Sequence, residues 1–465
     1  MVKLFGHYVP RQLLWLGLVE FLLLTGSVYL GVLLRHQLVN DAYAGSVESL
    51  LARALIFASV GWLLLTSVGL YQRELWHGIQ DVLFRLTGAV AVAGLTMMLI
   101  QYSIPSLHMW RGEFAISLLI AWVGLLLSRT FIFIFKRNEW FNHRLMVLGT
   151  GQRAAEIGQL SATMGERGFN LIGFIQNPEE HVAVPDSQVV KYNGSLYETL
   201  MNMNIDELVI AKRDRRKNFP MDQILECKTR GIQVTDLFSF YERETGKVRL
   251  DAISPGDIIF SEGFHQPMYK RIVKRIFDLF SSLALFSMVW PLMLFTALAI
   301  WLESGLKGSV LYHQARVGRD GEVFDVLKFR SMVENAEVDG KPQWAQQNDS
   351  RITNVGRLIR KTRIDELPQL LNVIQGQMSF VGPRPERPEF VKQFGESIPY
   401  YNIRHCVKPG ITGWAQIRYS YGASEEEARE KLQFDLYYVK NHSLFLDLMV
   451  LFQTIYVILW AKGAR

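Results

Sequence analysis

The chain has 465 residues, of which 49% are hydrophobic and 20% charged, and its mean hydropathy is +0.11. It is too long for one ordinary domain and too apolar for several soluble ones, so we expect a membrane protein of two or three parts. Basic residues beside apolar helices explain the net charge of +6 more simply than nucleic acid does. No nucleic acid partner is therefore expected.

Two cysteines, Cys227 and Cys406, lie far apart in the sequence. Neither has a second cysteine or a histidine pair at the spacing of a zinc site, so we expect neither a disulfide framework nor structural zinc. Two inert thiols in a reducing compartment are the simplest expectation.

Long apolar stretches dominate residues 1–140, and each approaches the roughly 20 residues needed to cross the hydrocarbon of a bilayer. They predict a transmembrane region of four helices, at Leu13–Leu34, Ala52–Leu70, Val82–Ile100 and Phe114–Phe135.

Basic residues flank this region, with Lys3 and Arg11 before the first helix and Lys136 and Arg137 after the fourth. An even number of spans places both pairs on one side, and the positive-inside rule makes that side the cytoplasm. The rest of the chain should therefore lie on the cytoplasmic face.

Three ionisable residues, Glu20, Arg85 and Arg129, fall within or at the edge of the apolar stretches. They could mark a transport path. The simpler interpretation places them near helix ends or between helices, with their polar ends reaching toward water.

Short strands and amphipathic helices take over in residues 141–265. A buried strand at Leu145–Leu148 runs into a Gly-x-Gly-x-x-Ala turn with Gly149 and Gly151, the kind of turn that brings backbone N–H groups near a pyrophosphate. Further strands are expected at Leu171–Ile175 and Glu207–Ile210. The alternation predicts a Rossmann-like parallel sheet.

The end of the second strand does not favour a working dinucleotide site, because Gln176-Asn177 stands where an acidic residue would hold a ribose hydroxyl. Membrane-anchored nucleotide-sugar dehydratases share this order of helices and Rossmann domain and provide a rival hypothesis. Those enzymes need a Tyr-x-x-x-Lys pair, and no tyrosine of this chain has a lysine four positions on. A docking, dimerising or regulatory module is therefore favoured.

A further apolar stretch covers residues 277–302 and contains Pro291. It is long enough to span, but a crossing would place everything after it outside the cell. A proline inside a helix removes a hydrogen bond and bends the axis. We expect a re-entrant helix that kinks at Pro291 and returns to the same face, with another span as the alternative.

Eleven Lys and Arg residues fall between Lys307 and Arg363, among them Lys328 and Arg330. A basic surface beside a membrane suits a nucleotide diphosphate or a lipid phosphate. By itself, such a run is more often a solvated face.

Asp365 and Glu366 stand just before a predicted helix, because leucines recur behind them at helical spacing and Pro368 is tolerated only in a first turn. The helix N-terminus and the preceding basic residues should keep Asp365 ionised and gather phosphate and a divalent cation beside it. The plain alternative is an N-cap aspartate with a solvated glutamate.

Pro383 and Pro385 hold the backbone around Arg384 extended, which fixes the direction of its guanidinium for a phosphate contact. Arg404 then precedes a Gly-rich basic loop that begins at Lys408. No P-loop or nucleophile elbow accompanies these residues.

Six motifs occur in order between Met268 and Leu448: a Trp-Pro-broken helix, KFRSM, DELPQL, SFVGPRPE, RH with KPGITGWAQ, and FDLYYVKNHS. Together they resemble the bacterial sugar transferase family, the monotopic phosphoglycosyl transferases that load a sugar phosphate onto polyprenyl phosphate. The N-terminal helices and Rossmann-like domain resemble its long form, found in exopolysaccharide and capsule initiation. The resemblance implies a mainly helical catalytic domain over residues 266–465, at a bacterial inner membrane.

The family's Asp-Glu pair falls on Asp365 and Glu366. The resemblance implies that Asp365 attacks the β-phosphorus of a UDP-sugar, releases UMP and holds the sugar phosphate until undecaprenyl phosphate accepts it. It also implies that both carboxylates hold Mg²⁺, that membrane lipid is a partner, and that the protein is a homodimer. The residues expected to contact substrate are Lys328, Arg330, Arg360, Pro383, Arg384, Arg404, Lys408 and Arg418.

Two features limit what the resemblance implies. Many relatives continue the Gly-Trp-Ala-Gln loop with Val-Asn-Gly, whereas this chain has Ile417 to Gly422, so the sugar stays open, with glucose 1-phosphate first and galactose 1-phosphate second. The last helix, Ser443 to Trp460, carries Asp447 and Gln453 and is expected to lie at the membrane interface.

Two rival hypotheses stand beside the transferase. One is the NAD-dependent dehydratase working from the middle domain, against which the missing Tyr-x-x-x-Lys pair argues. The other is a polysaccharide-assembly scaffold without chemistry.

Overall fold

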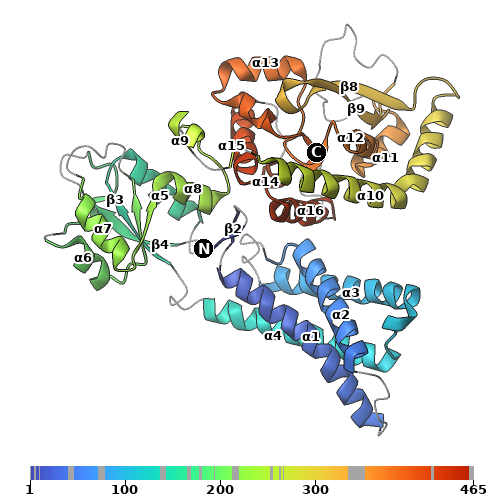
Figure 1. Ribbon diagram of the computed structural model, residues 1–465, viewed down its shortest axis with the longest axis horizontal. Helices are drawn as coiled ribbons and strands as arrows, with labels where there is room; N and C mark the ends of the chain where they lie inside the picture. The colour runs from blue at the N-terminus through green and yellow to red at the C-terminus, as the bar shows by residue number, and fades with distance from the viewer. Residues whose placement is uncertain are drawn as a thin grey trace. The chain divides into compact units, whose positions relative to one another are not determined.

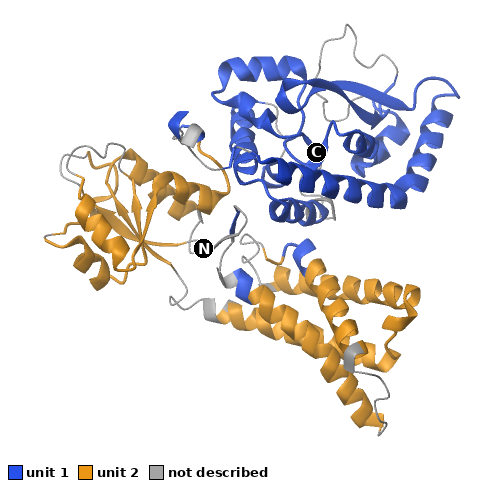
Figure 2. Ribbon diagram, viewed as in Figure 1, with its two compact units in different colours: residues 1–15, 65–69, 250–465 blue, residues 16–64, 70–249 orange. Residues whose placement is uncertain are grey.

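The computed structural model describes residues 2–4, 7–9, 11–39, 47–71, 79–136, 143–164, 169–176, 181–192, 194–211, 219–251, 255–260, 263–264, 266–333, 351–419 and 424–459 (Figure 1). Arg137, Asn177, Trp460 and most of the loop before Gly422 lie outside the described residues. Residues 1–15, 65–69 and 250–465 form one compact unit, the C-terminal unit, and residues 16–64 and 70–249 form the N-terminal unit (Figure 2).

Four long apolar helices begin the chain, and each is long and apolar enough to cross a membrane. They are α1 (Arg11–Val39), α2 (Val47–Ser67), α3 (Ile79–Ser103) and α4 (Arg111–Lys136), with a 3-10 turn η2 (Pro105–Leu107) before the last. The predicted set of four is confirmed, with each helix a few residues longer than its apolar stretch.

Charged residues inside this region are buried and paired. Glu20 of α1 is 0% exposed, and its carboxylate lies 2.7 Å from Arg129 Nε of α4. Tyr71 donates to Glu20 (2.5 Å), and Arg129 also donates to the Leu70 carbonyl (2.8 Å). These charged residues lie between helices, as the simpler interpretation expected, but they are buried and do not reach toward water.

A five-stranded parallel sheet of order β5-β4-β3-β6-β7 forms the α/β part of the N-terminal unit. The strands are β3 (Arg144–Leu148), β4 (Asn170–Ile175), β5 (Val189–Val190), β6 (Glu207–Ile210) and β7 (Gln233–Asp236). The helices are α5 (Gln152–Met164), α6 (Leu196–Asn202), α7 (Met221–Thr229) and α8 (Leu237–Thr245), with the 3-10 turn η5 (Asp186–Gln188).

Two apolar cores flank this sheet. One contains Ile157 of α5 and Phe240 of α8, and the other contains Leu200 of α6 and Cys227 of α7. The arrangement confirms the predicted parallel sheet, and Cys227 is a free, buried thiol within it. Cys406 is free but exposed.

The C-terminal unit is mainly helical, as expected. Its first half contains α9 (Pro255–Phe260), α10 (Met268–Glu303), β8 (Leu311–Val317), the 3-10 turn η6 (Arg319–Gly321), β9 (Val323–Phe329), α11 (Asn354–Lys361), the 3-10 turn η8 (Ile364–Glu366) and α12 (Gln369–Gln375). Its second half contains β10 (Ser379–Val381), α13 (Pro388–Ser397), the 3-10 helix η9 (Tyr401–Cys406), β11 (Gly410–Thr412), α14 (Trp414–Arg418), α15 (Glu425–Asn441) and α16 (Leu444–Leu459). Strands β8 and β9 form an antiparallel hairpin, and β10 pairs with β11 in parallel.

The long apolar helix α10 is continuous through Pro291. The proline therefore does not end the helix, because neighbouring turns keep their hydrogen bonds around the one it removes. Figure 1 shows that the yellow C-terminal part of α10 turns away from the direction of its first part. The helix is bent, as the predicted kink requires, but it is not interrupted.

The two ends of the chain both contribute to the C-terminal unit. In α16, Asp447 is fully buried and Gln453 is 8% exposed, so both face protein. A short hairpin of β1 (Val2–Leu4) and β2 (His7–Val9) belongs to the same unit. Its His7 lies 2.7 Å from the Tyr437 hydroxyl and edge-on to Trp414. The sequence carried no sign of this packing.

Candidate active site

Asp365 and Glu366 lie in the turn η8 directly before α12. Arg363 precedes them in a left-handed backbone conformation with φ of 60°, which costs a non-glycine residue free energy and recurs at functional sites. Pro368 stands at the N-cap of α12, where no helical N–H is lost. The pair therefore stands just before a helix N-terminus, as predicted.

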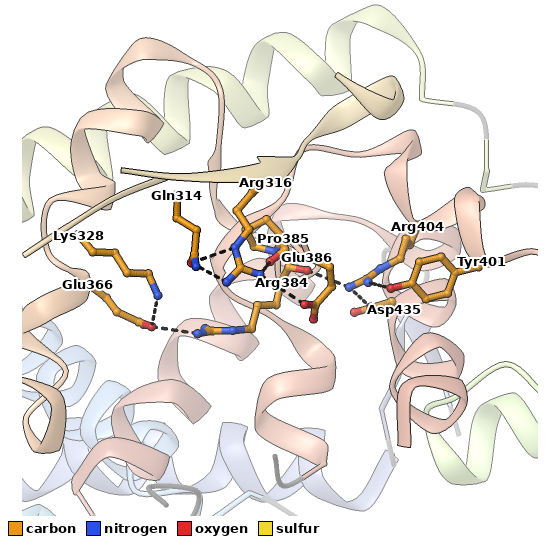
Figure 3. Close-up of polar contacts among 10 residues, drawn as sticks. All are labelled: Gln314, Arg316, Lys328, Glu366, Arg384, Pro385, Glu386, Tyr401, Arg404 and Asp435. Atoms are coloured by element: carbon orange, nitrogen blue, oxygen red, sulfur yellow. Dashed lines mark hydrogen bonds and ion pairs between the residues drawn. The ribbon is translucent and has the colours of Figure 1, made fainter. Parts of the chain in front are cut away.

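Glu366 is surrounded by basic side chains. Its Oε1 lies 3.0 Å from Arg384 Nη2, 3.3 Å from Lys328 Nζ and 3.8 Å from Arg363 Nη1. Figure 3 shows Lys328 and Arg384 meeting at this carboxylate. Burial disfavours its charge, but the attraction of Arg384, Lys328 and Arg363 outweighs burial and holds the pKa of Glu366 well below its usual range.

Asp365 has the opposite environment. Burial and the neighbouring charge of Glu366 raise the pKa of Asp365, and Lys328, Arg363 and Arg360 only partly offset them. The basic residues favour the ionised form of Asp365, as expected, but burial and the charge of Glu366 act against them. Among the described residues, Asp365 Oδ1 is buried without a hydrogen-bond partner.

Lys328 comes from β9, and Asn372 of α12 holds that strand. Asn372 Oδ1 accepts from the Leu327 N–H (3.0 Å), and its Nδ2 donates to the Asp325 carbonyl (2.8 Å). Because α12 begins directly after the two carboxylates, one helix positions both them and Lys328. Sequence reasoning missed Asn372, although a polar residue on the inner face of an apolar helix was a usable signal.

The arm that carries Arg384 is fixed through its backbone. The Gly410 N–H donates to the Pro383 carbonyl (2.9 Å), and Arg316 Nη1 donates to the Pro385 carbonyl (3.1 Å). The expected rigidity of this segment is therefore present, and Pro383 acts through its carbonyl. Arg316, on β8, was not predicted.

Arg404 supports the same arm. It is 7% exposed, and its Nη2 lies 2.9 Å from the Arg384 carbonyl and 2.8 Å from Asp435 Oδ2. Its Nη1 donates to the Tyr401 hydroxyl (2.7 Å). Figure 3 shows this guanidinium between Tyr401 and Asp435. Arg404 was expected to contact substrate, and its side chain is engaged with protein groups that hold Arg384 in place.

The remaining predicted contacts lie in other surroundings. Arg330 follows β9 directly, and its backbone N–H donates to a neighbouring carbonyl. Lys408 lies near Arg275, and burial together with that charge lowers the pKa of Lys408. Arg418 lies over the Trp414 ring, 4.5 Å from its centre.

The glycine turn of the N-terminal unit connects β3 to α5, and Gly149 adopts a φ of 126° that favours glycine. The Gly149 N–H donates to the Ile175 carbonyl (2.9 Å), and the Thr150 carbonyl accepts from the Ala183 N–H (2.7 Å). These backbone groups are used within the fold. A nucleotide at Gly149 and Gly151 stays a prediction.

Comparison with known proteins matches residues 269–461 to the bacterial sugar transferase family. The UDP-N-acetylgalactosamine-undecaprenyl-phosphate N-acetylgalactosaminephosphotransferase of Aeromonas hydrophila is 43% identical over 242 residues, 52% of this chain and 56% of that protein. The UDP-glucose:undecaprenyl-phosphate glucose-1-phosphate transferase of Escherichia coli K12 is 30% identical over 374 residues, 75% of each chain. The undecaprenyl-phosphate galactose phosphotransferase of Salmonella typhimurium is 27% identical over 424 residues, 85% of this chain and 83% of that protein.

Proposed function

This chain belongs to the bacterial sugar transferase family and is an undecaprenyl-phosphate sugar phosphotransferase, and we propose that Asp365 is its nucleophile. The carboxylate attacks the β-phosphorus of a UDP-sugar, the bond to the leaving phosphate breaks, and UMP departs. A phosphate oxygen of undecaprenyl phosphate then attacks the same phosphorus and displaces Asp365. Two steps let a soluble donor and a lipid acceptor use the site in turn.

One observation carries the assignment of roles: the two adjacent carboxylates have opposite surroundings. Glu366 is engaged by three cations, whereas Asp365 Oδ1 has no hydrogen-bond partner among the described residues. A carboxylate with a raised pKa is also the more basic and more nucleophilic of the two. Asp365 is therefore the group available to form a new bond.

The basic residues around the pair suit the donor diphosphate. Lys328 and Arg384 already meet at Glu366, and Arg360 lies close enough to act on Asp365. Phosphoryl transfer depends mainly on positioning and on neutralising oxygen charge. These three cations would bind the phosphates, and Glu366 keeps the side chains of Lys328 and Arg384 in place.

Mg²⁺ fits this pair of carboxylates only with the donor's help. No group of three or more acidic, histidine or cysteine side chains that could hold a metal ion is found in the described part of the chain. Mg²⁺ is commonly held by one or two carboxylates together with substrate phosphates, which matches the unpartnered oxygen of Asp365 beside Glu366. Bound there, the ion would offset charge on the diphosphate.

The helix α10 is proposed to be re-entrant. Near its beginning, Arg275 donates to the carbonyls of Val373 (2.5 Å) and Ile374 (2.7 Å), and at its end Glu303 accepts from the Asn354 N–H (2.8 Å). Both ends are thus tied to one compact unit, which a straight crossing of about 30 Å of hydrocarbon would prevent. Cysteine labelling after residue 303 from the periplasmic side would contradict this topology.

The transferred group is proposed to be a hexose 1-phosphate, with glucose first and galactose second. Relatives named for glucose, galactose and N-acetylgalactosamine all match the chain, so the donor panel should contain UDP-glucose, UDP-galactose and UDP-N-acetylgalactosamine. Purified protein, undecaprenyl phosphate and Mg²⁺ are incubated with each donor, and UMP is measured. Preference for a donor outside the two hexoses would overturn the sugar assignment.

The nucleophile is tested by Asp365→Asn with the preferred donor. An amide cannot form the acyl phosphate, so we expect UMP release to be abolished and no labelled sugar phosphate to remain on the protein. When the wild-type reaction is stopped before the acceptor is added, the protein should retain the labelled sugar phosphate. UMP release by Asp365→Asn at the wild-type rate would exclude Asp365 as the nucleophile.

A further inference from the structure

A buried polar cluster joins the apolar helix α10 to strand β10. Asp278 of α10 is 2% exposed, and its Oδ1 accepts hydrogen bonds from Ser379 Oγ (3.0 Å) and from the Phe380 N–H (3.1 Å). Lys274, one turn earlier, lies 3.3 Å from the same oxygen. A buried charge on a membrane helix is costly unless it is paired, so its presence indicates a function beyond packing.

The other side of β10 is held by the same cluster. The Tyr438 hydroxyl lies 2.9 Å from the Val381 carbonyl and 2.6 Å from Asp447 Oδ1, and it donates to one of them at a time. Asp447 Oδ2 lies 2.7 Å from Lys274 Nζ, which closes the cluster back to α10. Helices α10, α15 and α16 thus fix three successive residues of one short strand.

This strand leads directly to Arg384. The Gly382 N–H donates to the Thr412 carbonyl (2.9 Å), and the prolines at 383 and 385 restrict the backbone around Arg384. Arg384 Nη2 then reaches Glu366 Oε1 (3.0 Å). With so little flexible chain between them, a displacement of β10 would move the guanidinium out of the site.

We propose that Asp278 is a positioning residue for the transferase reaction: it holds β10 so that Arg384 stands at the donor diphosphate. Because Asp278 belongs to α10, the donor site is complete only when the membrane helix is seated against the unit. The inference rests on the proposed contact between Arg384 and the donor.

The test is a double-mutant cycle on the full-length protein in nanodiscs, with Asp278→Ala, Arg384→Ala and the double variant. We expect Asp278→Ala to raise the donor KM roughly tenfold, the size of one charge-assisted contact, with a smaller effect on kcat. The double variant should have the KM of Arg384→Ala alone, because coupled residues are not additive. Asp278→Asn keeps an oxygen acceptor for the Phe380 N–H and should recover most of the affinity.

Two further variants make the test decisive. Ser282→Ala removes a buried hydroxyl one turn later on the same helix and should leave the donor KM unchanged. Tyr438→Phe removes the hydroxyl beside the Val381 carbonyl and should also raise the donor KM. This variant tests the proposal independently if Asp278→Ala does not fold.

The possible failures are distinguishable. A raised KM in Arg384→Ala with an unchanged KM in Asp278→Ala or Tyr438→Phe would overturn the positioning role alone. If the increases in donor KM caused by the two single substitutions multiply in the double variant, the positioning role is also overturned, because independent contacts contribute multiplicatively. An unchanged donor KM in Arg384→Ala would contradict the proposed contact between Arg384 and the donor. It would therefore overturn both that contact and the positioning role of Asp278.

Discussion

The proposed chemistry depends on how two neighbouring carboxylates differ. Asp365 and Glu366 are adjacent in the sequence, yet burial and the charge of Glu366 raise the pKa of Asp365, whereas nearby cations lower that of Glu366. The negative charge of Glu366 keeps Lys328 and Arg384 close to Asp365 without occupying the oxygens of Asp365. These opposite surroundings support the proposal that Asp365 is the reactive carboxylate and Glu366 the one that holds the cations.

The pH dependence of Lys328→Met tests this division. The lysine charge lowers the pKa of Asp365, so its removal should raise that pKa further. If Asp365 reacts as a carboxylate, as proposed, activity is lost as the pH falls through this pKa. We expect the acidic limb of kcat/KM for UMP release to move to higher pH.

Lys361→Met is the matched control, since Lys361 is an exposed lysine at the end of α11. The acidic limb of kcat/KM for Lys361→Met should coincide with that of the wild type. A limb for Lys328→Met that stays in place or moves to lower pH would contradict the electrostatic account.

At the scale of elements, the close approach of β10 and β11 brings the SFVGPRPE and KPGITGWAQ motifs together. Glycines at 382 and 410 permit that approach, since a Cβ on Gly410 would lie 2.1 Å from the Gly382 backbone nitrogen. The parallel pairing of these strands links the loop after Pro409 to the arm that carries Arg384. Two separate sequence motifs thus form one rigid support.

Gly410→Ala should separate the two strands. Overpacking against backbone typically costs about 1 to 3 kcal/mol, so we expect a lower unfolding temperature and a marked loss of UMP release. Gly395→Ala is the control, because there the nearest atoms belong to the Asn402 side chain at 3.4 Å and alanine favours the helix. Equal stability of the two variants would show that β10 and β11 need not lie so close.

At the scale of the whole molecule, the two compact units have different kinds of interior. The C-terminal unit contains connected polar clusters, whereas the membrane helices of the N-terminal unit bury an ion pair between Glu20 and Arg129. Tyr71 and the Leu70 carbonyl complete the hydrogen bonds of that pair. Such a pair specifies which faces of α1 and α4 meet.

Arg129→Met should destabilise the protein, because it leaves the Glu20 carboxylate buried without its cation. Breaking a buried pair in this way costs about 3 to 5 kcal/mol, whereas the double variant Glu20→Gln/Arg129→Met should recover much of the loss. Thermal unfolding of the full-length protein in detergent measures both. A double variant less stable than Arg129→Met would contradict the pairing.

Much of the fold was readable from local pattern. Apolar length predicted the four helices, and strand spacing with the glycine turn predicted the parallel sheet, because membrane thickness and sheet geometry both act through neighbouring residues. Asp365, Glu366, Lys328 and Arg384 were found through motifs. The role of Arg404 was not, because an arginine in a motif looks the same whether it faces substrate or supports the backbone of another arginine.

The amino-acid order alone predicted membrane helices, a carboxylate pair at a helix start and a basic segment near it, since these follow from composition and local spacing, and the ordered motifs predicted the enzyme family. The arrangement in space settled which carboxylate is paired, which arginines are buried, and what Asp278, Asn372 and Asp435 contact. Burial and distance between segments far apart in the chain set charge and hydrogen bonding, and no local pattern contains that information.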